Sequence, residues 1–416
     1  MTNNENPMPK CRFCGAQIEH SFVDLGMSPL CQTHILPSEL NKYETFYPLH
    51  AFVCTECWLV QLDEFVSPEE IFGDYDYFSS FSSSWVEHAK KYSEKMTEGL
   101  RLDESSLVVE IASNDGYLLQ HFVNANIPVL GVEPAANVAA AAIEKGIRTT
   151  VKFFGEKTAE KLKSEFGSAD LLLGNNVLAH VPDINDFVKG MKILLGEKGT
   201  ITMEFPHLLN LIQLNQFDTI YHEHFSYLSF FTVQKIFAHH GITLFDVEEI
   251  PTHGGSLRIY GKHDTDDSRV VSENVGKLLD KEISMGINDL QIYKKYEEQV
   301  KETKRKLLSF LIQAKNEGKT IVGYGAPGKG NTLLNYCAIR QDFLDYTVDL
   351  STQKQGKYTP GCRLPILDPR VIKETRPDYV LVLPWNLIDE ISRQHSYISE
   401  WGGKFVVPIP EVKIID

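Results

Sequence analysis

Four cysteines near the start of the chain have the spacing of a metal site. Cys11 and Cys14 form one C-x-x-C pair, and Cys54 and Cys57 form a second. Two such pairs supply four thiolates, which complete the tetrahedral shell of a structural zinc ion. A redox centre needs only one pair, and catalytic zinc needs an open coordination position. The four-sulfur pattern therefore predicts a structural zinc site.

A histidine-rich segment carries side chains suited to moving protons. It reads Tyr-His-Glu-His from Tyr221 to His224, at the start of the polar stretch 221–229. Imidazole and carboxylate groups are the common general acids and bases near neutral pH. A metal pair is disfavoured because no third ligand follows at a suitable spacing. On these residues alone, acid–base chemistry and a solvated loop both stay open.

A third group of polar residues surrounds a turn with a single glycine. The turn ends at Gly116 and follows the apolar run 107–111, and Glu133 ends the next apolar run. A carboxylate at that strand tip can accept both hydroxyls of a ribose. One glycine is too few for close approach of a pyrophosphate, so the turn favours S-adenosylmethionine over a dinucleotide, and another nucleotide is the alternative. The expected cofactor-binding residues are Glu110, Ser113, Asn114, Asp115, Gly116, Glu133, Asn175 and Asn176.

Two further groups lie beside predicted strand ends or domain edges. His180 follows the predicted strand 169–176, next to the expected methyl-donor site. Tyr75 and Tyr77 belong to an aromatic and serine-rich run just after the cysteine pairs. Tyrosine hydroxyls often bind ligands, but packing over the sheet is an equally common role for them. Both interpretations stay open for the two tyrosines.

A second glycine turn occurs in the last third of the chain. Residues 323–328 match G-x-G-x-x-G, and Asp349 follows at a predicted strand end. Taken alone, this pattern is a dinucleotide fingerprint, so an NAD-dependent nucleotide-sugar oxidoreductase is the alternative function. The stretch also nearly matches an ATP-binding phosphate loop. Gly330 stands where that loop needs a hydroxyl for magnesium, which disfavours an ATPase.

The elements that position these residues alternate between strands and helices. Apolar runs at 107–111, 129–133, 169–176 and 199–204 predict a parallel, doubly wound sheet. Runs at 242–250 and 256–261 flank a turn and predict the closing hairpin that is usual in class I methyltransferases. The fold prediction is α/β with three parts: a zinc-binding domain at 1–80, a Rossmann-like class I methyltransferase domain at 81–262, and a C-terminal Rossmann-like α/β domain at 263–416.

Composition excludes several kinds of partner. The 416 residues include 41 Lys and Arg against 56 Asp and Glu, for a net charge of −15. This charge argues against bulk binding to nucleic acid or an acidic membrane. No apolar run is long enough to span a bilayer, and the polar first ten residues do not resemble a signal peptide. We expect a cytoplasmic protein whose thiols are reduced or bound to metal, in which Cys31 and His34 are loop residues. The sequence leaves the oligomeric state open, with a monomer as one option.

Taken together, the motifs resemble the sugar C-methyltransferases of deoxysugar biosynthesis. The resemblance covers nearly the whole chain and includes the paired C-x-x-C, E-x-x-S-N-D-G, G-V-E-P-A, N-V-L-A-H-V-P, Y-H-E-H-F-S-Y and G-Y-G-A-P-G-K-G-N. It implies S-adenosylmethionine as methyl donor and a nucleotide-diphosphate 4-keto-deoxysugar as substrate. The implied reaction is methylation at C3 through an enolate that a base generates.

The resemblance also implies roles for individual residues. His224 matches the base, with Glu223 and Tyr221 orienting the imidazole and the sugar, and Tyr75 and His180 match positions that face the sugar. The second glycine turn would hold the diphosphate on its backbone N–H groups. The implied substrate-binding residues are Tyr77, Gly325, Lys329, Gly330, Asn331 and Lys354. For Lys354, the alternative is a position in a solvated surface loop. For the whole chain, a third possible function is that of a zinc-bearing interaction protein with degenerate nucleotide folds.

Overall fold

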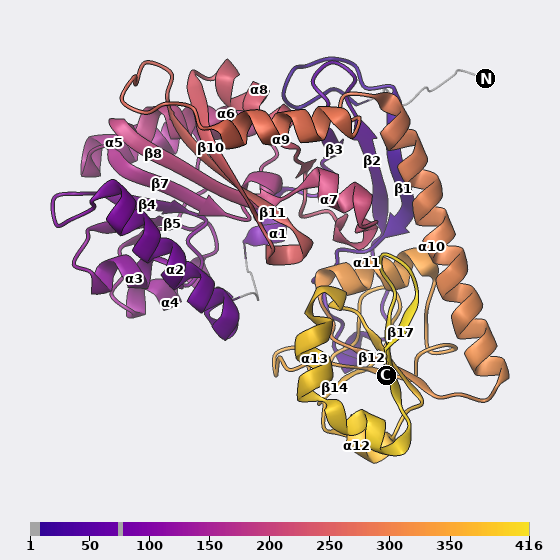
Figure 1. Cartoon of the computed structure of the whole chain (residues 1–416). Coiled ribbons are helices and arrows are strands. Elements are labelled where there is room, and N and C mark those ends of the chain that lie inside the picture. The colour runs from indigo at the N-terminus through magenta and orange to yellow at the C-terminus, as the bar shows by residue number, and fades with distance from the viewer. Residues whose placement is uncertain (1–8, 74–77, 416) are drawn as a thin grey trace. The chain divides into compact units, whose positions relative to one another are not determined.

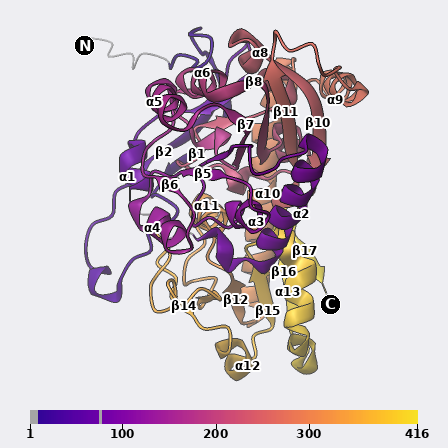
Figure 2. The same cartoon turned by 90° about the vertical axis from the view of Figure 1, so that its left-hand side faces the viewer.

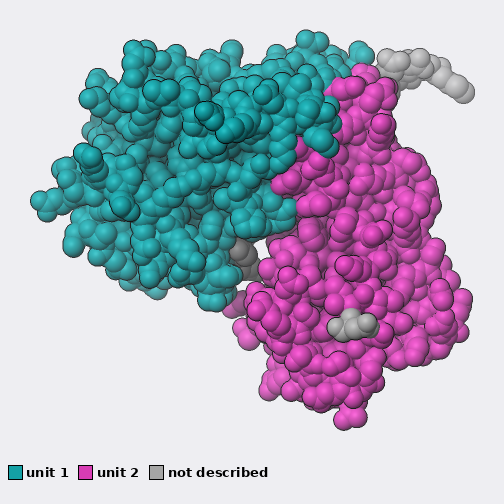
Figure 3. Space-filling view, viewed as in Figure 1, with its two compact units in different colours: residues 1–19, 54–207, 225–288 teal, residues 20–53, 208–224, 289–416 magenta. Residues whose placement is uncertain are grey.

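The computed structural model describes residues 9–73 and 78–415 (Figure 1). The chain divides into two compact units, and each is assembled from three separate segments (Figure 3). Unit 1 contains residues 1–19, 54–207 and 225–288, and unit 2 contains residues 20–53, 208–224 and 289–416. None of the described helices has the length and apolar character needed to cross a membrane.

Unit 1 is organised around a seven-stranded sheet. Its strands in spatial order are β10 (Ile242–Ile250), β11 (Ser256–His263), β8 (Leu195–Pro206), β7 (Ala169–Asn175), β4 (Val108–Ile111), β5 (Val129–Val132) and β6 (Thr149–Thr150). The strands from β8 to β6 run parallel, whereas β11 is antiparallel to both β8 and β10. The parallel sheet and its closing hairpin confirm the prediction from the apolar runs.

Helices cover both faces of this sheet (Figures 1 and 2). One layer contains α2 (Ser83–Leu100), α3 (Leu119–Asn124) and α4 (Ala136–Glu144), and the other contains α5 (Glu156–Phe166), α6 (Ile184–Leu194) and α8 (Phe230–His239). All four residues of β4 and of β5 are buried, as expected for central strands covered on both sides. The last helix of unit 1 is α9 (Glu273–Ser284), and α1 (Pro68–Phe72) follows the cysteine segment. A short ladder joins β3 (Val60–Leu62) to β9 (Ser226–Tyr227).

Unit 2 contains a second, smaller Rossmann-like sheet. Its spatial order is β14 (Ile366–Leu367), β13 (Thr347–Val348), β12 (Ile321–Tyr324), β15 (Tyr379–Val382), β16 (Lys404–Val407) and β17 (Lys413–Ile415). The first five strands are parallel and β17 is antiparallel. The connecting helices are α11 (Gly328–Cys337), α12 (Val371–Thr375) and α13 (Ile388–Gln394).

Two segments from earlier in the chain complete unit 2. Residues 20–53 contribute the antiparallel pair β1 (His20–Ser28) and β2 (Tyr47–Val53), and 208–224 contribute α7 (Leu208–Gln213) and the 3-10 turn η4 (Phe217–Thr219). The 27-residue helix α10 (Leu290–Asn316) packs on β1. There Phe22 stacks on Tyr296 with ring centroids 4.6 Å apart. The unit therefore includes residues that lie between the two cysteine pairs in the sequence.

Candidate active site

The four cysteines converge within unit 1. Their Sγ atoms all lie within 4.8 Å of one another, with Cys11 and Cys57 at 3.5 Å and Cys14 and Cys54 at 3.6 Å. A tetrahedral zinc ion with Zn–S bonds of about 2.3 Å requires sulfur atoms about 3.8 Å apart. In the first knuckle, Gly15 has φ +75° and donates its N–H to the Cys11 carbonyl. The donor set and its spacing fit a closed, structural zinc site.

The single-glycine turn of unit 1 is tied to the next strand by an acidic side chain. Asn114 N donates to Glu133 Oε2 at 2.9 Å, and Ala135 N donates to Glu133 Oε1 at 2.9 Å. Gly116 has φ +76°, and a Cβ there would meet Ile147 Cδ1 at 2.2 Å. The turn therefore needs glycine at this position, and the oxygens of Glu133 keep further lone pairs for ribose hydroxyls.

Unpartnered buried carboxyl oxygens surround the same turn. Glu110 is fully buried, and neither of its carboxyl oxygens has a hydrogen-bond partner. Burial raises the pKa of Glu110 well above its usual range, and the negative charges of Glu133 and Asp115 raise it further. Ser113 Oγ and Asp115 Oδ1 also lack partners. Such groups are costly unless a ligand supplies donors, and S-adenosylmethionine carries both an ammonium and a sulfonium group.

Polar and aromatic side chains gather at the neighbouring strand ends. Asn175 Nδ2 donates to Tyr117 Oη at 3.3 Å, and Asn176 Nδ2 lies 3.0 Å from His253 Nε2. Trp85 stacks near Tyr117 with ring centroids 6.0 Å apart. Tyr117 follows the turn glycine directly and could have been noticed from that position, whereas nothing in the local sequence marks Trp85 or His253. His180 lies in the 3-10 turn after β7, with its ring 5.6 Å from Phe72.

Glu204, at the end of β8, was missed by the sequence analysis. It is buried and accepts hydrogen bonds from Arg258 Nη2 at 2.7 Å and Thr252 Oγ1 at 2.9 Å, and its Oε2 lies 3.0 Å from His88 Nε2. Burial acts to raise the pKa of Glu204, but the hydrogen bond with His88 and the charge of Arg258 outweigh it and lower the pKa. The available signal was its position as the last residue of the predicted strand 199–204.

The histidine-rich segment belongs to unit 2. His224 is buried, and its Nδ1 lies 2.8 Å from the Thr219 carbonyl oxygen. A carbonyl only accepts, so this contact places the proton on Nδ1 and leaves the lone pair of a neutral imidazole at Nε2. The Tyr221 ring lies 4.1 Å from the His224 ring between centroids. The imidazole is thereby fixed in the tautomer and orientation that a general base needs.

Unit 2 brings this segment together with the second glycine turn through a residue of the N-terminal third. Cys31 Sγ donates to Glu223 Oε1 at 3.5 Å, and the Cys31 carbonyl accepts from Asn331 Nδ2 at 2.7 Å. A Cβ on Gly328 would lie 2.9 Å from Cys31 Sγ. Close by, Thr332 Oγ1 donates to the carbonyl of Ile220 at 3.1 Å. Cys31 lies in a turn, as expected, and its side chain is buried between two predicted functional segments.

The second glycine turn is also hydrogen-bonded to an acidic side chain from the end of the next strand. Ala326 N donates to Asp349 Oδ2 at 2.8 Å, and Lys354 Nζ donates to the Ala326 carbonyl at 3.0 Å. Gly325 has φ +86°, and a Cβ there would meet Pro384 Cδ at 2.6 Å. A Cβ on Gly330 would meet Leu383 Cβ at 2.9 Å. Cys31 and Gln32 pack against the helix start at Gly328, where a Cβ would lie 2.9 Å from Cys31 Sγ and 3.2 Å from Gln32 Nε2.

The predicted site residues thus fall into two groups. Unit 1 holds the zinc cysteines, His180 and the cofactor residues from Glu110 to Asn176. Unit 2 holds Tyr221, Glu223, His224, Gly325, Lys329, Gly330, Asn331 and Lys354. Tyr75 and Tyr77 lie outside the described residues.

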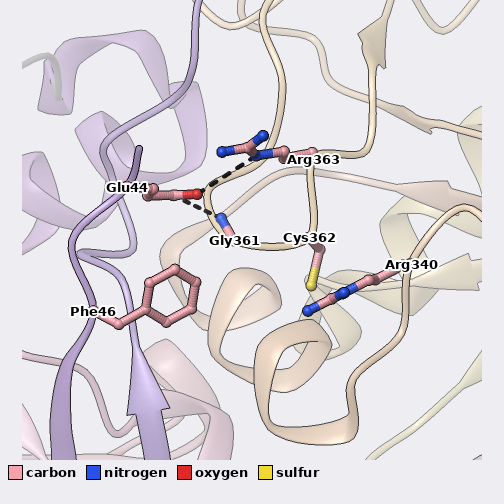
Figure 4. A pocket seen from close by; sticks show the side chains of 6 residues that line it. All are labelled: Glu44, Phe46, Arg340, Gly361, Cys362 and Arg363. Carbon is pink, nitrogen blue, oxygen red and sulfur yellow. Dashed lines mark hydrogen bonds and ion pairs between the residues drawn. The ribbon is translucent and has the colours of Figure 1, made fainter. Parts of the chain in front are cut away.

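A shallow pocket of about 410 Å³ lies elsewhere in unit 2 (Figure 4). It is lined by Glu44, Phe46, Arg340, Gly361, Cys362 and Arg363. Glu44 accepts from Gly361 N at 2.7 Å and pairs with Arg363 Nε at 3.8 Å. Arg340 lies three residues beyond Cys337, the last residue of α11, at the end of the helix opposite its glycine turn. None of the predicted site residues lines it.

Comparison with known proteins decides the family. Residues 11–72 match the model "Putative zinc binding domain", residues 86–247 match "Methyltransferase domain", and residues 251–410 match "C-methyltransferase C-terminal domain". The chain is also 35% identical to C-methyltransferase NovU of Streptomyces niveus over 409 residues, which cover 98% of this chain and 97% of that one. The chain belongs to this C-methyltransferase family.

Solved structures resemble part of this C-methyltransferase. Protein PH0226 from Pyrococcus horikoshii OT3 shares 14% identity at a TM-score of 0.37, over 45% of this chain and 94% of that one. Magnesium protoporphyrin IX methyltransferase (ChlM) from Synechocystis PCC 6803, with bound SAH, shares 14% identity at a TM-score of 0.33, over 43% of this chain and 81% of that one.

The family and the geometry together confirm the main predictions. The chain is an S-adenosylmethionine-dependent C-methyltransferase with a Rossmann-like methyltransferase domain, mixed α/β sheets and an N-terminal four-cysteine zinc site. The cofactor predictions, S-adenosylmethionine and zinc, are confirmed at the level of the family and of the cysteine cluster. The roles of individual side chains remain predictions.

Proposed function

We propose that this C-methyltransferase transfers a methyl group to C3 of a nucleotide-diphosphate 4-keto-deoxysugar. The observation that supports it most is in unit 2, where Cys31 contacts both Glu223 and Asn331. A segment suited to proton abstraction and a turn suited to phosphate therefore belong to one packed site. A substrate with an acidic C–H bond and an anionic handle matches that combination.

The chemistry follows from the carbonyl group at C4. A hydrogen at C3 is acidic because the resulting anion is an enolate, and Nε2 of His224 takes that proton. S-adenosylmethionine, when bound, supplies a methyl group activated by its sulfonium. The C3 carbon forms the new C–C bond as the S–CH₃ bond breaks, and S-adenosylhomocysteine leaves. In this proposal Glu223 and Tyr221 orient the imidazole and the sugar, while His180 and Tyr75 bind sugar oxygens.

The two glycine turns take the two ligands. In unit 1, Glu133 accepts the ribose hydroxyls and Glu110 faces the cationic end of the methyl donor, with Asn175 and Asn176 at the adjoining strand end. In unit 2, the start of the ten-residue helix α11 offers backbone N–H groups to the diphosphate. The proposed partners of the diphosphate in unit 2 are Gly325, Lys329, Gly330, Asn331 and Lys354.

The NAD-dependent oxidoreductase has less support. In a dinucleotide site the acidic residue after the second strand binds a ribose. Here Asp349 has a cation beside it, since Lys354 Nζ lies 3.7 Å from its Oδ2, and a ribose hydroxyl would have to compete with that ion pair. Calorimetry with NAD and with S-adenosylhomocysteine separates the two functions, and we expect binding of the second ligand alone.

A panel of substrates tests the proposal. The enzyme is incubated with S-adenosylmethionine and 4-keto-deoxysugars linked to thymidine, uridine or guanosine diphosphate, and the masses of the products are measured by mass spectrometry. We expect one of them to gain a single methyl group. In D₂O with S-adenosylhomocysteine in place of the donor, the same substrate should exchange its C3 hydrogen for deuterium. If no substrate of the panel is methylated, the proposed substrate class is wrong. Methylation without hydrogen exchange in D₂O would argue against the enolate step.

A further inference from the structure

The ammonium group of Lys329 has neutral neighbours. Lys329 is half-buried as the second residue of α11, and its Nζ donates to Asn386 Oδ1. The same Nζ lies 4.5 Å from the centroid of the Trp385 ring. Within the described residues, no carboxylate lies within ion-pair distance of it. An amide oxygen and an aromatic face orient a cation without neutralising its charge.

A buried carboxylate fixes the aromatic face. Trp385 Nε1 donates to Asp218 Oδ2 at 2.6 Å. Asp218 is fully buried, and its other oxygen, Oδ1, has no hydrogen-bond partner. A hydrogen bond at the edge of an indole restricts rotation of the ring, so the face that Lys329 meets is held in place. Asn386 follows Trp385 directly in the 3-10 turn η6 (Trp385–Leu387), so one short turn supplies both contacts of the ammonium.

Charge links Asp218 and Lys329 across the ring. Burial lowers the pKa of Lys329 to about 8, and the negative charge of Asp218 opposes that shift. Burial also raises the pKa of Asp218 to about 6, and Lys329 opposes that shift. Asp218 is the charged group that acts on Lys329 in the described part of the chain. Between these two pKa values Asp218 is an anion and Lys329 a cation.

The same 3-10 turn also holds the proposed base. Asp218 and Thr219 are consecutive residues of η4. Thr219 accepts from His224 Nδ1 through its carbonyl, and Asp218 accepts from Trp385 through its side chain. The turn therefore fixes an imidazole on one side and, through an indole, an ammonium on the other. Residues 167 positions apart in the chain are joined by the second of these contacts.

We propose that Lys329, Trp385 and Asn386 form a diphosphate subsite, and that Asp218 and Trp385 are its positioning residues. The inference rests on the proposed function for its nucleotide-sugar ligand. Lys329 Nζ makes no direct ion pair within the described residues, so a phosphate oxygen that binds it displaces no existing ion pair. Ligand binding then exchanges a neutral amide contact for a charge-assisted one.

Calorimetry with simple anions tests the subsite directly. The probes are thymidine 5′-diphosphate and inorganic pyrophosphate, and S-adenosylhomocysteine serves as a ligand that the change should not affect. We expect Trp385→Ala to weaken thymidine diphosphate binding about tenfold, because it removes the ring under the ammonium. Trp385→Phe keeps a ring face but loses the indole N–H, so an intermediate loss of about threefold is expected. Both variants should bind S-adenosylhomocysteine like the wild type.

Matched controls come from the same unit. Trp401→Phe removes an indole N–H that donates to the Pro377 carbonyl, and Arg340→Gln removes a cation at the separate pocket of Figure 4. Neither should change the affinity for thymidine diphosphate by more than about twofold. If Trp385→Ala does not fold, the comparison of Trp385→Phe with Trp401→Phe carries the test.

The variant Asp218→Asn separates the role of Asp218 in positioning the Trp385 ring from the effect of its negative charge on Lys329. The amide oxygen of asparagine can still accept from the Trp385 indole, but the negative charge that supports the Lys329 ammonium is gone. We expect the affinity for thymidine diphosphate to be close to wild type at pH 6.5 and to fall progressively below it as the pH is raised to 8.5. With substrate, the loss at the higher pH should appear in KM and leave kcat unchanged.

The outcomes are distinguishable. Wild-type enzyme that binds S-adenosylhomocysteine but neither phosphate probe contradicts the nucleotide-sugar function itself. Wild-type enzyme that binds the probes, together with Trp385→Ala or Trp385→Phe that bind them equally well, overturns the subsite and leaves the proposed function standing. An Asp218→Asn variant with the same loss at every pH would show that Asp218 only supports the fold.

Discussion

The two Rossmann-like turns of this enzyme share one local feature, a backbone N–H that donates to an acidic side chain, and they differ in the charged groups around it. In unit 1, Glu133 accepts from Asn114 N at 2.9 Å, and in unit 2, Asp349 accepts from Ala326 N at 2.8 Å. Each acid follows the second strand of its sheet and ties the turn after the first strand. Beyond that point the surroundings diverge. Buried carboxyl groups gather at the first turn, where neither oxygen of Glu110 has a hydrogen-bond partner, and lysines gather at the second.

This difference indicates what each turn is built to hold. Acidic groups favour a ligand with a positive end, such as a sulfonium nucleoside, whereas ammonium groups favour a phosphate. The backbone geometry is nearly the same, so it does not by itself choose the ligand. Side chains from outside the strand–turn–helix make that choice in unit 2, where Cys31, Trp385 and Asn386 come from distant parts of the chain.

The largest expected effect comes from removing the proposed base of unit 2. His224→Asn should lower kcat by about 100- to 10,000-fold, because proton abstraction loses its acceptor. Binding of S-adenosylhomocysteine and of thymidine diphosphate should change by less than about threefold, since neither turn is altered. The measurement is steady-state kinetics together with calorimetry. A variant that keeps more than about a tenth of the wild-type rate would move the role to another residue.

Loss of zinc should act on unit 1 through stability. Cys14→Ser removes one of four sulfur ligands, so we expect the metal content measured by plasma mass spectrometry to fall from one zinc per chain toward none. The thermal unfolding midpoint should drop by about 10 °C, since a structural site contributes folding free energy directly. Cys362→Ser, which changes a thiol outside the cluster, is the matched control. Equal midpoints in the two variants would contradict a structural role for the metal.

Removing one charge from each turn tests whether the two turns bind different ligands. Glu133→Ala should weaken S-adenosylhomocysteine binding by about tenfold or more, and Lys329→Gln should weaken thymidine diphosphate binding by about tenfold. Each variant should leave the other ligand within about twofold of wild type. A single variant that weakens both ligands equally would mean that the turns are not specialised in this way.

The two turns should also respond to pH with opposite signs. Lys329 has a lowered pKa of about 8, so thymidine diphosphate binding should weaken as the pH rises through that value and should take up a proton. Glu110 has a raised pKa, and a cationic ligand favours its ionised form. Binding of S-adenosylmethionine should therefore release a proton. Calorimetry in buffers of different ionisation enthalpy measures the number of protons taken up or released on binding of each ligand. Proton uptake with both ligands, or release with both, would contradict the proposed difference between the two turns.

The smallest effect is expected at a partly exposed ion pair beside the first turn. Lys145 Nζ lies 3.0 Å from Asp115 Oδ2, and the lysine side chain is 39% exposed. Solvent screens such a pair, so Lys145→Met should change the free energy of unfolding by less than about 1 kcal/mol. Urea denaturation is the measurement. A larger loss would show that this ion pair holds the first turn in its conformation.

Local patterns made much of the fold predictable. The two C-x-x-C pairs, the single-glycine turn before Gly116 and the hairpin 242–261 each depend on residues close together in the sequence, and the structure contains all three. Spacing carries such features because the chain needs few long-range contacts to form them. The family resemblance added the order of the motifs, which no single motif provides.

Long-range contacts were not predictable in the same way. Nothing near Cys31 indicates that its thiol meets Glu223, and nothing near Trp385 indicates that its indole meets Asp218. These pairs form because the segments 20–53, 208–224 and 289–416 fold into one unit. A single sequence contains no local signal for such an assembly, so the residues that position the proposed base and lysine were missed.

The interleaved construction of the two units limits how this enzyme can be divided. The chain passes from one unit to the other at residues 19/20, 53/54, 207/208, 224/225 and 288/289. No single cut releases either unit with all of its parts, so a truncated gene cannot encode either unit alone. Exchanging unit 2 with that of a homologue would require three grafts made together, and a recombination event with one crossover would leave at least one unit with segments from both parents.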